Sequence, residues 1–143
     1  MKRRILVVIL FIPLTLVLTV PHPLFSQTCN DNEAMVKSYE ATLADLVSTV
    51  KKESLSAFQK GYHQQSCLTD LNLSLTLVDP LLECLDKQAK DTAATKEQAD
   101  AAKNKEQTYA ALKSMLGRDR DTLKTAKDPK AAKAIIEKFT ITP

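Results

Sequence analysis

The stretch from Cys67 to Asp86 is the most apolar part of the chain after its N-terminal segment, and its pattern predicts a helix. Every second residue from Leu71 to Leu77 is a leucine, as in a half-buried strand, but this alternation stops at Val78. At about 100° per residue, the apolar residues instead form two adjacent stripes. The first stripe has the heptad spacing of a coiled coil and comprises Leu68, Leu71, Leu75, Val78, Leu82 and Leu85. The second stripe comprises Leu73, Leu77, Leu81 and Cys84. Because an apolar arc of about 220° is too wide for one neighbour, we expect a central helix contacted on two sides.

The polar residues of this stretch support the helix, because they fall on a single narrow stripe. They are Thr69, Asn72, Thr76, Asp79 and Glu83. Pro80 opposes a continuous helix, since it lacks the amide that would bond the Thr76 carbonyl and its ring clashes with that turn. The sequence therefore predicts a kink, or a new helix with Asp79 as its cap and Pro80 as its first residue.

The preceding segment predicts a long helix that forms an antiparallel hairpin with the central one. Asn30 to Asn32 provide N-caps and Glu33 places a negative charge in the first turn. Gly61 is expected to end the helix in a left-handed conformation, and Tyr62 to Ser66 to form the turn. Apolar residues at heptad spacing form the inner face, and charged residues the outer face. The inner face comprises Val36, Tyr39, Leu43, Leu46, Val50 and Ala57, with Met35, Val47 and Phe58 beside it. The outer face comprises Lys37, Glu40, Asp45, Lys51 and Lys52.

Residues 86–108 contain no large apolar side chain and are rich in Ala and Lys, which predicts a solvated helix. A flexible segment is the alternative, because such a sequence buries too little to hold itself in place. A weak apolar stripe from Ala94 to Leu116 lies on the other side of the helical wheel from the leucine stripe. This change of phase predicts a break or a different neighbour.

Further signals divide the C-terminal part. Gly117 is expected to end a helix, and 119–127 to form a short one around Leu123. Asp128 followed by Pro129 is a cap with proline in the first turn, so a last helix should begin there. Its apolar residues are Ala132, Ile135, Ile136 and Phe139.

Residues 1–27 have the features of a secretory signal peptide. Three basic residues within Met1 to Arg4 precede a long apolar run, and a broken segment follows it. An uncleaved membrane anchor, or a lipid attached to Cys29, are the alternatives, and we expect membrane contact only in those cases. The prediction is therefore a secreted or periplasmic protein whose residues 28–143 form a single all-α domain, a small helical bundle.

Three cysteines in an exported chain suggest one disulfide and one free thiol. Cys67 and Cys84 would lie about 25 Å apart on one helix, beyond the reach of a disulfide. Cys29 must then pair with one of them, and the hairpin places Cys84 much nearer to it. We predict a Cys29–Cys84 disulfide and a buried free Cys67.

The charge is divided between the two halves of the chain. Residues 27–86 carry 4 basic and 9 acidic residues, a net charge of −5, and residues 87–143 carry 13 basic and 8 acidic residues, a net charge of +5. Packing of the two halves against each other is the favoured explanation. A basic surface for an acidic partner is the alternative, with Lys96, Lys103 and Lys105 as its candidate binding residues.

The residues needed for common catalytic and cofactor sites are few. His63 is the one histidine after the signal segment, with no nucleophile and orienting acid marked out near it, and His63 with Cys67 supplies two metal ligands where a zinc site needs more. Two glycines exclude a phosphate-binding loop, and the interleaved charges disfavour nucleic acid. We therefore expect no enzyme activity, no cofactor and no metal.

The leading functional hypothesis is a non-enzymatic exported protein that binds another, still unidentified, protein in the cell envelope or exterior. The alternative hypothesis is a carrier that holds a hydrophobic ligand between its helices, suggested by the wide leucine-rich arc.

Overall fold

A computed structural model of the chain describes residues 29–141, and these form an all-helical bundle, as predicted. The signal peptide prediction lies outside the described residues. The five helices in the described part are α1 (Cys29–Lys52), α2 (Leu55–Lys60), α3 (His63–Ala89), α4 (Lys96–Lys124) and α5 (Pro129–Ile136). Within this part, no helix combines the length and apolar character that a membrane span requires.

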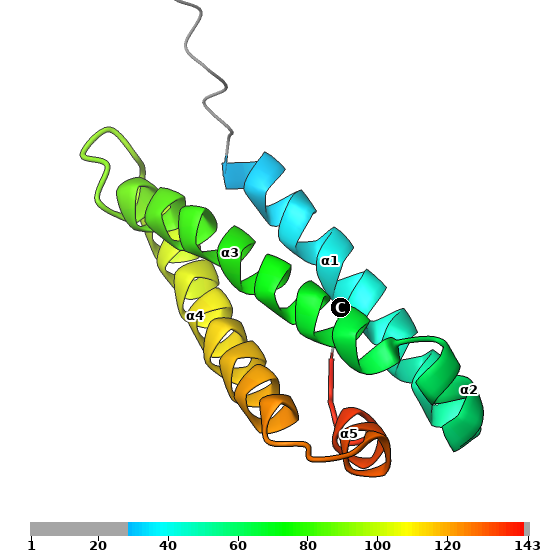
Figure 1. Cartoon of the computed structure of the whole chain (residues 1–143). Helices are drawn as coiled ribbons and strands as arrows, with labels where there is room; N and C mark the ends of the chain where they lie inside the picture. Colours follow the sequence, from blue (N-terminus) through cyan, green and yellow to red (C-terminus); the bar gives the residue numbers. More distant parts are fainter. Residues whose placement is uncertain (1–28, 142–143) are drawn as a thin grey trace, which may run out of the picture.

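Helix α3 is the central element, and α1 and α4 flank it on two sides (Figure 1). Helices α1 and α3 form the predicted antiparallel hairpin, with the short α2 between them. Helix α5 lies across the end of the bundle near α2 and contacts each of the other helices. The expectation of a central helix contacted on two sides is confirmed, and the leucine-rich arc is largely covered by its neighbours.

The most buried line of α3 runs between the two predicted stripes. It consists of Cys67, Leu71, Ser74, Val78, Leu81 and Leu85. Leu68, Leu75 and Leu82, which belong to the first predicted stripe, are half-buried, and Leu73 is 41% exposed. Because one neighbour packs on each side of the arc, its centre is covered from both sides and its edges from one.

Helix α3 continues through Pro80, so the predicted restart at Asp79 is wrong. A proline inside a helix costs about 3 kcal/mol or more. The flanking Val78, Leu81 and Leu85 are almost fully buried, and each such side chain contributes about 1.5–3 kcal/mol. Since Pro80 itself is exposed, its ring meets solvent rather than a neighbouring helix, and burial on the opposite face keeps the helix continuous.

The predicted first helix is divided in two. Helix α1 ends at Lys52, and Ser54 caps α2 by accepting a 3.2 Å hydrogen bond from the Ala57 amide on its Oγ. A serine that bonds the amide three residues ahead is a strong N-cap, so the chain can restart a helix there at little cost. The restart turns Ala57 to solvent, contrary to expectation, and buries Phe58 to 2% exposure.

The start of α1 also differs from the prediction. The helix begins at Cys29, so Asn30 to Asn32 lie inside its first turn and do not cap it. Asn32 is buried, and Asp31 supplies the acidic group of the first turn in place of Glu33. Glu33 therefore lies one turn further on, where it faces α4.

Residues 86–108 do not form one helix. They comprise the end of α3, a connection over residues 90–95 and the beginning of α4. Thr95 caps α4 in a capping box with Gln98, each side chain accepting a hydrogen bond from the other residue's backbone amide. The break predicted from the change of phase is confirmed, and the prediction of a single helix over the whole segment is wrong.

Gly117 does not end a helix, because α4 continues through it to Lys124. The predicted short helix around Leu123 is instead the last part of α4, where Leu123 is fully buried. The start of α5 agrees with the prediction: the Asp128 carboxylate accepts a 2.8 Å hydrogen bond from the Ala131 amide, and Pro129 follows in the first turn.

Candidate functional site

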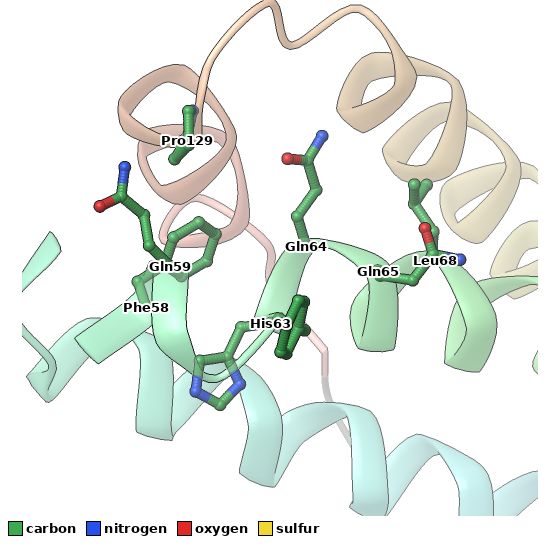
Figure 2. Close-up of a pocket in the computed structure, with 8 residues that line it drawn as sticks. Phe58, Gln59, His63, Gln64, Gln65, Leu68 and Pro129 are labelled. Atoms are coloured by element: carbon green, nitrogen blue, oxygen red, sulfur yellow. The ribbon is translucent and has the colours of Figure 1, made fainter. Parts of the chain in front are cut away.

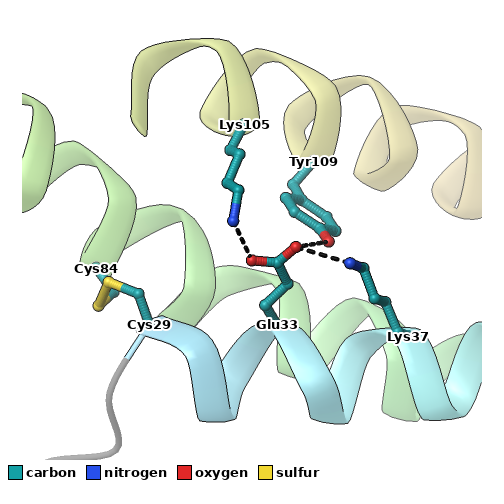
Figure 3. A network of polar contacts seen from close by, with 6 residues as sticks. All are labelled: Cys29, Glu33, Lys37, Cys84, Lys105 and Tyr109. Atoms are coloured by element: carbon teal, nitrogen blue, oxygen red, sulfur yellow. Dashed lines mark hydrogen bonds and ion pairs between the residues drawn. A yellow bond between two sulfur atoms is a disulfide. The ribbon is translucent and has the colours of Figure 1, made fainter. Parts of the chain in front are cut away.

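The predicted disulfide is present and joins the first residue of α1 to the last third of α3. Cys29 and Cys84 are bonded, with their Cα atoms 5.6 Å apart (Figure 3). Cys67 is free and buried, as predicted. Burial, with Asp70 and Asp119 nearby, raises the pKa of the Cys67 thiol to about 12. Because the thiolate is the nucleophile and the metal ligand, Cys67 is chemically inert at neutral pH.

Close to the disulfide, Glu33 joins α1 to α4 through a network that we call the Glu33 clamp, formed by Glu33, Lys37, Lys105 and Tyr109 (Figure 3). Lys105 Nζ donates to Glu33 Oε2 at 2.6 Å. Lys37 Nζ lies 2.9 Å from Oε1, and the Tyr109 hydroxyl donates to Oε1 at 3.2 Å. Hydrogen bonds from Lys105 and Lys37 lower the pKa of Glu33 to about 2. The clamp therefore closes the side of the bundle on which α1 and α4 face each other.

The three candidate lysines of α4 have different environments. Lys105 is exposed, but its ammonium group is paired with Glu33 across the gap between α4 and α1. Lys96 and Lys103 are exposed and make no ion pair with the described residues. The structure brings none of the three together in a shared pocket.

Some ion pairs cross the boundary between the acidic and the basic half of the chain. Four pairs in the described part join an acid from residues 27–86 to a lysine from residues 87–143. They are Glu83–Lys87, Asp86–Lys90, Glu33–Lys105 and Asp79–Lys113. Glu83–Lys87 and Asp86–Lys90 are i, i+4 pairs at the C-terminal end of α3. Glu33–Lys105 and Asp79–Lys113 join different helices, and these two pairs support packing of α4 against the first half of the chain.

Glu40, predicted on the outer face of the first helix, is instead buried to 6% exposure. It lies near Tyr109 in a cleft of about 410 Å³ between α1 and α4. Burial raises the pKa of Glu40, because an ionised carboxylate is poorly solvated there. The heptad pattern of α1 missed this position because it contained no signal for α4 packing beside it.

The corner between α2 and α3 holds an exposed aromatic side chain on an unfavourable backbone. Tyr62 has φ 52° and ψ 29°, and among the described residues it is the one non-glycine with positive φ. Its side chain is also the most exposed of the large apolar residues described, at 78%. The left-handed residue was predicted to be Gly61, which instead has φ −81°.

His63 packs against Gly61 at this corner. A Cβ at position 61 would lie 2.3 Å from His63 Nε2, so only glycine leaves room for the imidazole. That ring lies 2.9 Å from Glu53 Oε2 through Nε2, and its centroid is 6.0 Å from the Phe58 ring. Gly61 is in the right-handed region, and the left-handed conformation lies at Tyr62.

A pocket of about 370 Å³ opens beside Tyr62, where α2, α3 and α5 meet (Figure 2). We call it the corner pocket. Figure 2 shows Gln59 and Gln64 extending toward the side on which Pro129 begins α5. Its lining comprises Phe58, Gln59, Tyr62, His63, Gln64, Gln65, Leu68 and Pro129. No sequence pattern marks the three glutamines as binding residues, and the pattern around Tyr62 predicts a turn without indicating a role for its side chain.

The described residues offer little for catalysis or metal binding. No group of three or more His, Cys, Asp or Glu side chains in this part of the chain is placed to hold a metal ion. His63 is engaged by Glu53 and adjoins no nucleophile in the corner pocket.

Comparison with known proteins found no matching family model, no matching curated protein and no matching solved structure. The functional inference therefore depends on the geometry of the chain itself.

Proposed function

We propose that the protein is a non-enzymatic exported protein that binds another protein in the cell envelope or exterior, and that it does so through the corner where α2, α3 and α5 meet. The observation that carries this proposal is Tyr62. An L-residue in the left-handed region costs roughly 1–2 kcal/mol, and only glycine, asparagine and aspartate visit it routinely. A tyrosine there that is 78% exposed contributes little burial in return.

A strained, exposed aromatic side chain is typical of a binding surface. Strain of this kind persists where the surrounding structure imposes it, and it is concentrated at functional sites. Tyrosine is also enriched among the residues that dominate binding energy in protein interfaces, because it combines a large apolar area with a hydroxyl group. Leu55, 38% exposed on α2, adds an apolar side chain near the same end of the bundle.

Export is compatible with the disulfide. The Cys29–Cys84 bond is of the kind that forms and persists in oxidising compartments. The closed α1–α3 hairpin that results supports α2, which carries Phe58 beneath the corner.

Site-specific photo-crosslinking tests the proposal. A photoreactive residue replacing Gln65 places the label in the corner pocket, and the same residue replacing Lys103 is the matched control on exposed α4. In a native envelope or culture-fluid fraction, we expect one protein to crosslink at position 65 and not at position 103. Unlabelled protein should compete for that crosslink, and unlabelled Tyr62→Gly protein should compete at least tenfold less well.

The competition by Tyr62→Gly decides the outcome. Equal competition by the variant and the unchanged protein would show that Tyr62 does not bind the partner, and would refute the proposal. Crosslinking at position 103 alone would place the partner on α4 instead.

A further inference from the structure

The corner pocket has no Asp, Glu, Lys or Arg in its lining. Its one titratable ring besides the Tyr62 phenol is the His63 imidazole, whose Nε2 lies 2.9 Å from Glu53 Oε2. A charged ligand group would lose its hydration in such a pocket without gaining an opposite charge. The lining thus favours an uncharged ligand.

Three glutamines provide the hydrogen-bonding groups of the corner pocket. The side-chain amides of Gln59, Gln64 and Gln65 make no hydrogen bond within the described part of the chain. Each amide has an oxygen acceptor and an NH₂ donor, the same combination that a peptide group presents. A peptide segment whose backbone groups are not used in a helix or sheet would be complementary to them.

Apolar groups lie between these amides. Tyr62, Leu68 and Pro129 provide the accessible apolar lining of the corner pocket, and Phe58 closes its base with 2% exposure. Ligand pockets generally combine an apolar lining with a few convergent polar groups that fix orientation. The volume of about 370 Å³ is at the small end of the usual range, so it would hold a few residues.

We infer that the corner pocket binds an uncharged, extended peptide segment of the partner, an inference that rests on the function proposed above. One apolar side chain of the segment packs between Tyr62, Leu68 and Pro129. The glutamine amides bond its backbone, as in the recognition of polyproline-type segments, whose backbone groups are not bonded internally. Sugar hydroxyls also bond amide groups, so the test below includes an oligosaccharide.

The test uses NMR titration of the purified, disulfide-bonded protein. The first probe is a neutral, end-blocked octapeptide of alternating proline and leucine. The second has glutamate in place of leucine, and the third is a neutral oligosaccharide of N-acetylglucosamine. We expect the first probe to shift the side-chain NH₂ signals of Gln59, Gln64 and Gln65 saturably, and the other two to leave them unchanged.

A charge substitution provides the matched variant. Gln64→Glu and Gln65→Glu lie in the first turn of α3, where a negative charge favours the helix, so both variants should fold. Each should weaken binding of the proline–leucine peptide roughly tenfold, because a donor is lost and a charge enters an uncharged pocket. Gln88→Glu, an exposed position near the other end of α3, is the control and should bind as the unchanged protein does.

The outcomes separate the inference from the proposed function. Shifts caused by the oligosaccharide and not by the peptide would overturn the peptide inference. So would the absence of any shift while the position 65 crosslink still depends on Tyr62, and in that case the proposed function would stand. Saturable peptide binding without any Tyr62-dependent crosslink would support the pocket as a peptide site and refute Tyr62 as the partner contact.

Discussion

Substitution of Glu33 by glutamine tests whether the Glu33 clamp holds α1 against α4. Glu33 is 13% exposed, and its hydrogen bonds from Lys105 and Lys37 lower its pKa from 4.5 to about 2. One pKa unit corresponds to about 1.4 kcal/mol, so the ceiling for the lost stability is about 3 kcal/mol. The lysine side chains are 48% and 60% exposed, and water screens them. We therefore expect Glu33→Gln to lower the free energy of unfolding at pH 7 by about 1–2 kcal/mol.

The same pKa shift determines the pH dependence. A carboxyl group whose pKa is lower in the folded state contributes its full stabilisation above its unfolded value. For Glu33 this contribution should be lost as the pH falls from about 4.5 toward 2. The difference between the unchanged protein and Glu33→Gln should accordingly shrink over this interval.

Urea unfolding followed by circular dichroism at pH 7, 4 and 2.5 measures both effects. Asp45→Asn is the matched control, because Asp45 is an exposed carboxylate of α1 that makes no ion pair with the described residues. A double-mutant cycle of Glu33→Gln with Lys105→Met isolates the contact between α1 and α4, and its coupling energy should be about 1 kcal/mol.

Two results would refute this reasoning. One is a loss of stability for Glu33→Gln no larger than that for Asp45→Asn. The other is a coupling energy near zero between Glu33 and Lys105, which would mean that the two helices are held together by apolar packing alone.

Four further predictions concern single features. Tyr62→Gly should leave the free energy of unfolding unchanged or raise it by up to about 1 kcal/mol while partner binding is lost, and a clear loss of stability in a thermal melt would count against backbone strain. Gly117→Ala should stabilise α4 by about 0.5–1 kcal/mol, since a Cβ there meets no atom within 4 Å, and an unchanged or lower Tm would contradict this. Glu40→Gln should be more stable than the unchanged protein at pH 7, and urea unfolding should show this advantage shrinking as the pH falls through the raised pKa of Glu40. A difference in unfolding free energy that stays constant with pH would be inconsistent with a desolvated carboxylate. Lys96→Glu combined with Lys103→Glu should alter the free energy of unfolding by no more than about 1 kcal/mol, whereas Lys105→Glu should lower it through the loss of the ion pair with Glu33. Similar Tm losses for the two variants would contradict this difference. Capture of the partner at low and high salt then reports whether Lys96 and Lys103 contact it.

Several features follow from the sequence because the signals that specify them are local or geometric. The periodicity of the leucines sets the apolar arc of α3. Asp128 caps α5 by accepting a hydrogen bond from the amide three residues ahead, and Pro129 follows it in the first turn. The disulfide follows from the length of the central helix and the direction of the hairpin. Two cysteines 17 residues apart on one helix cannot meet, and an antiparallel hairpin brings Cys29 beside Cys84. None of these inferences requires knowledge of how α4 packs.

The tertiary structure decided where local signals are overridden. Pro80 disfavours a helix by about 3 kcal/mol and Gly117 by about 1 kcal/mol. Nevertheless α3 continues through Pro80 and α4 through Gly117, because apolar residues on either side are buried. The left-handed conformation lies at Tyr62 and not at Gly61, and the side chain of His63 packs against Gly61. Local sequence signals predict neither feature.

The candidate site depended on tertiary structure most strongly. Lys96, Lys103 and Lys105 are alike in a local pattern, but Lys105 pairs with Glu33, 72 residues earlier in the chain. The corner pocket likewise needs α5 beside α2, because Pro129 and Phe58 are separated by about half of the chain. Periodicity reports which face of a helix is apolar, and only the packed bundle determines which polar side chains find partners and which remain available for binding.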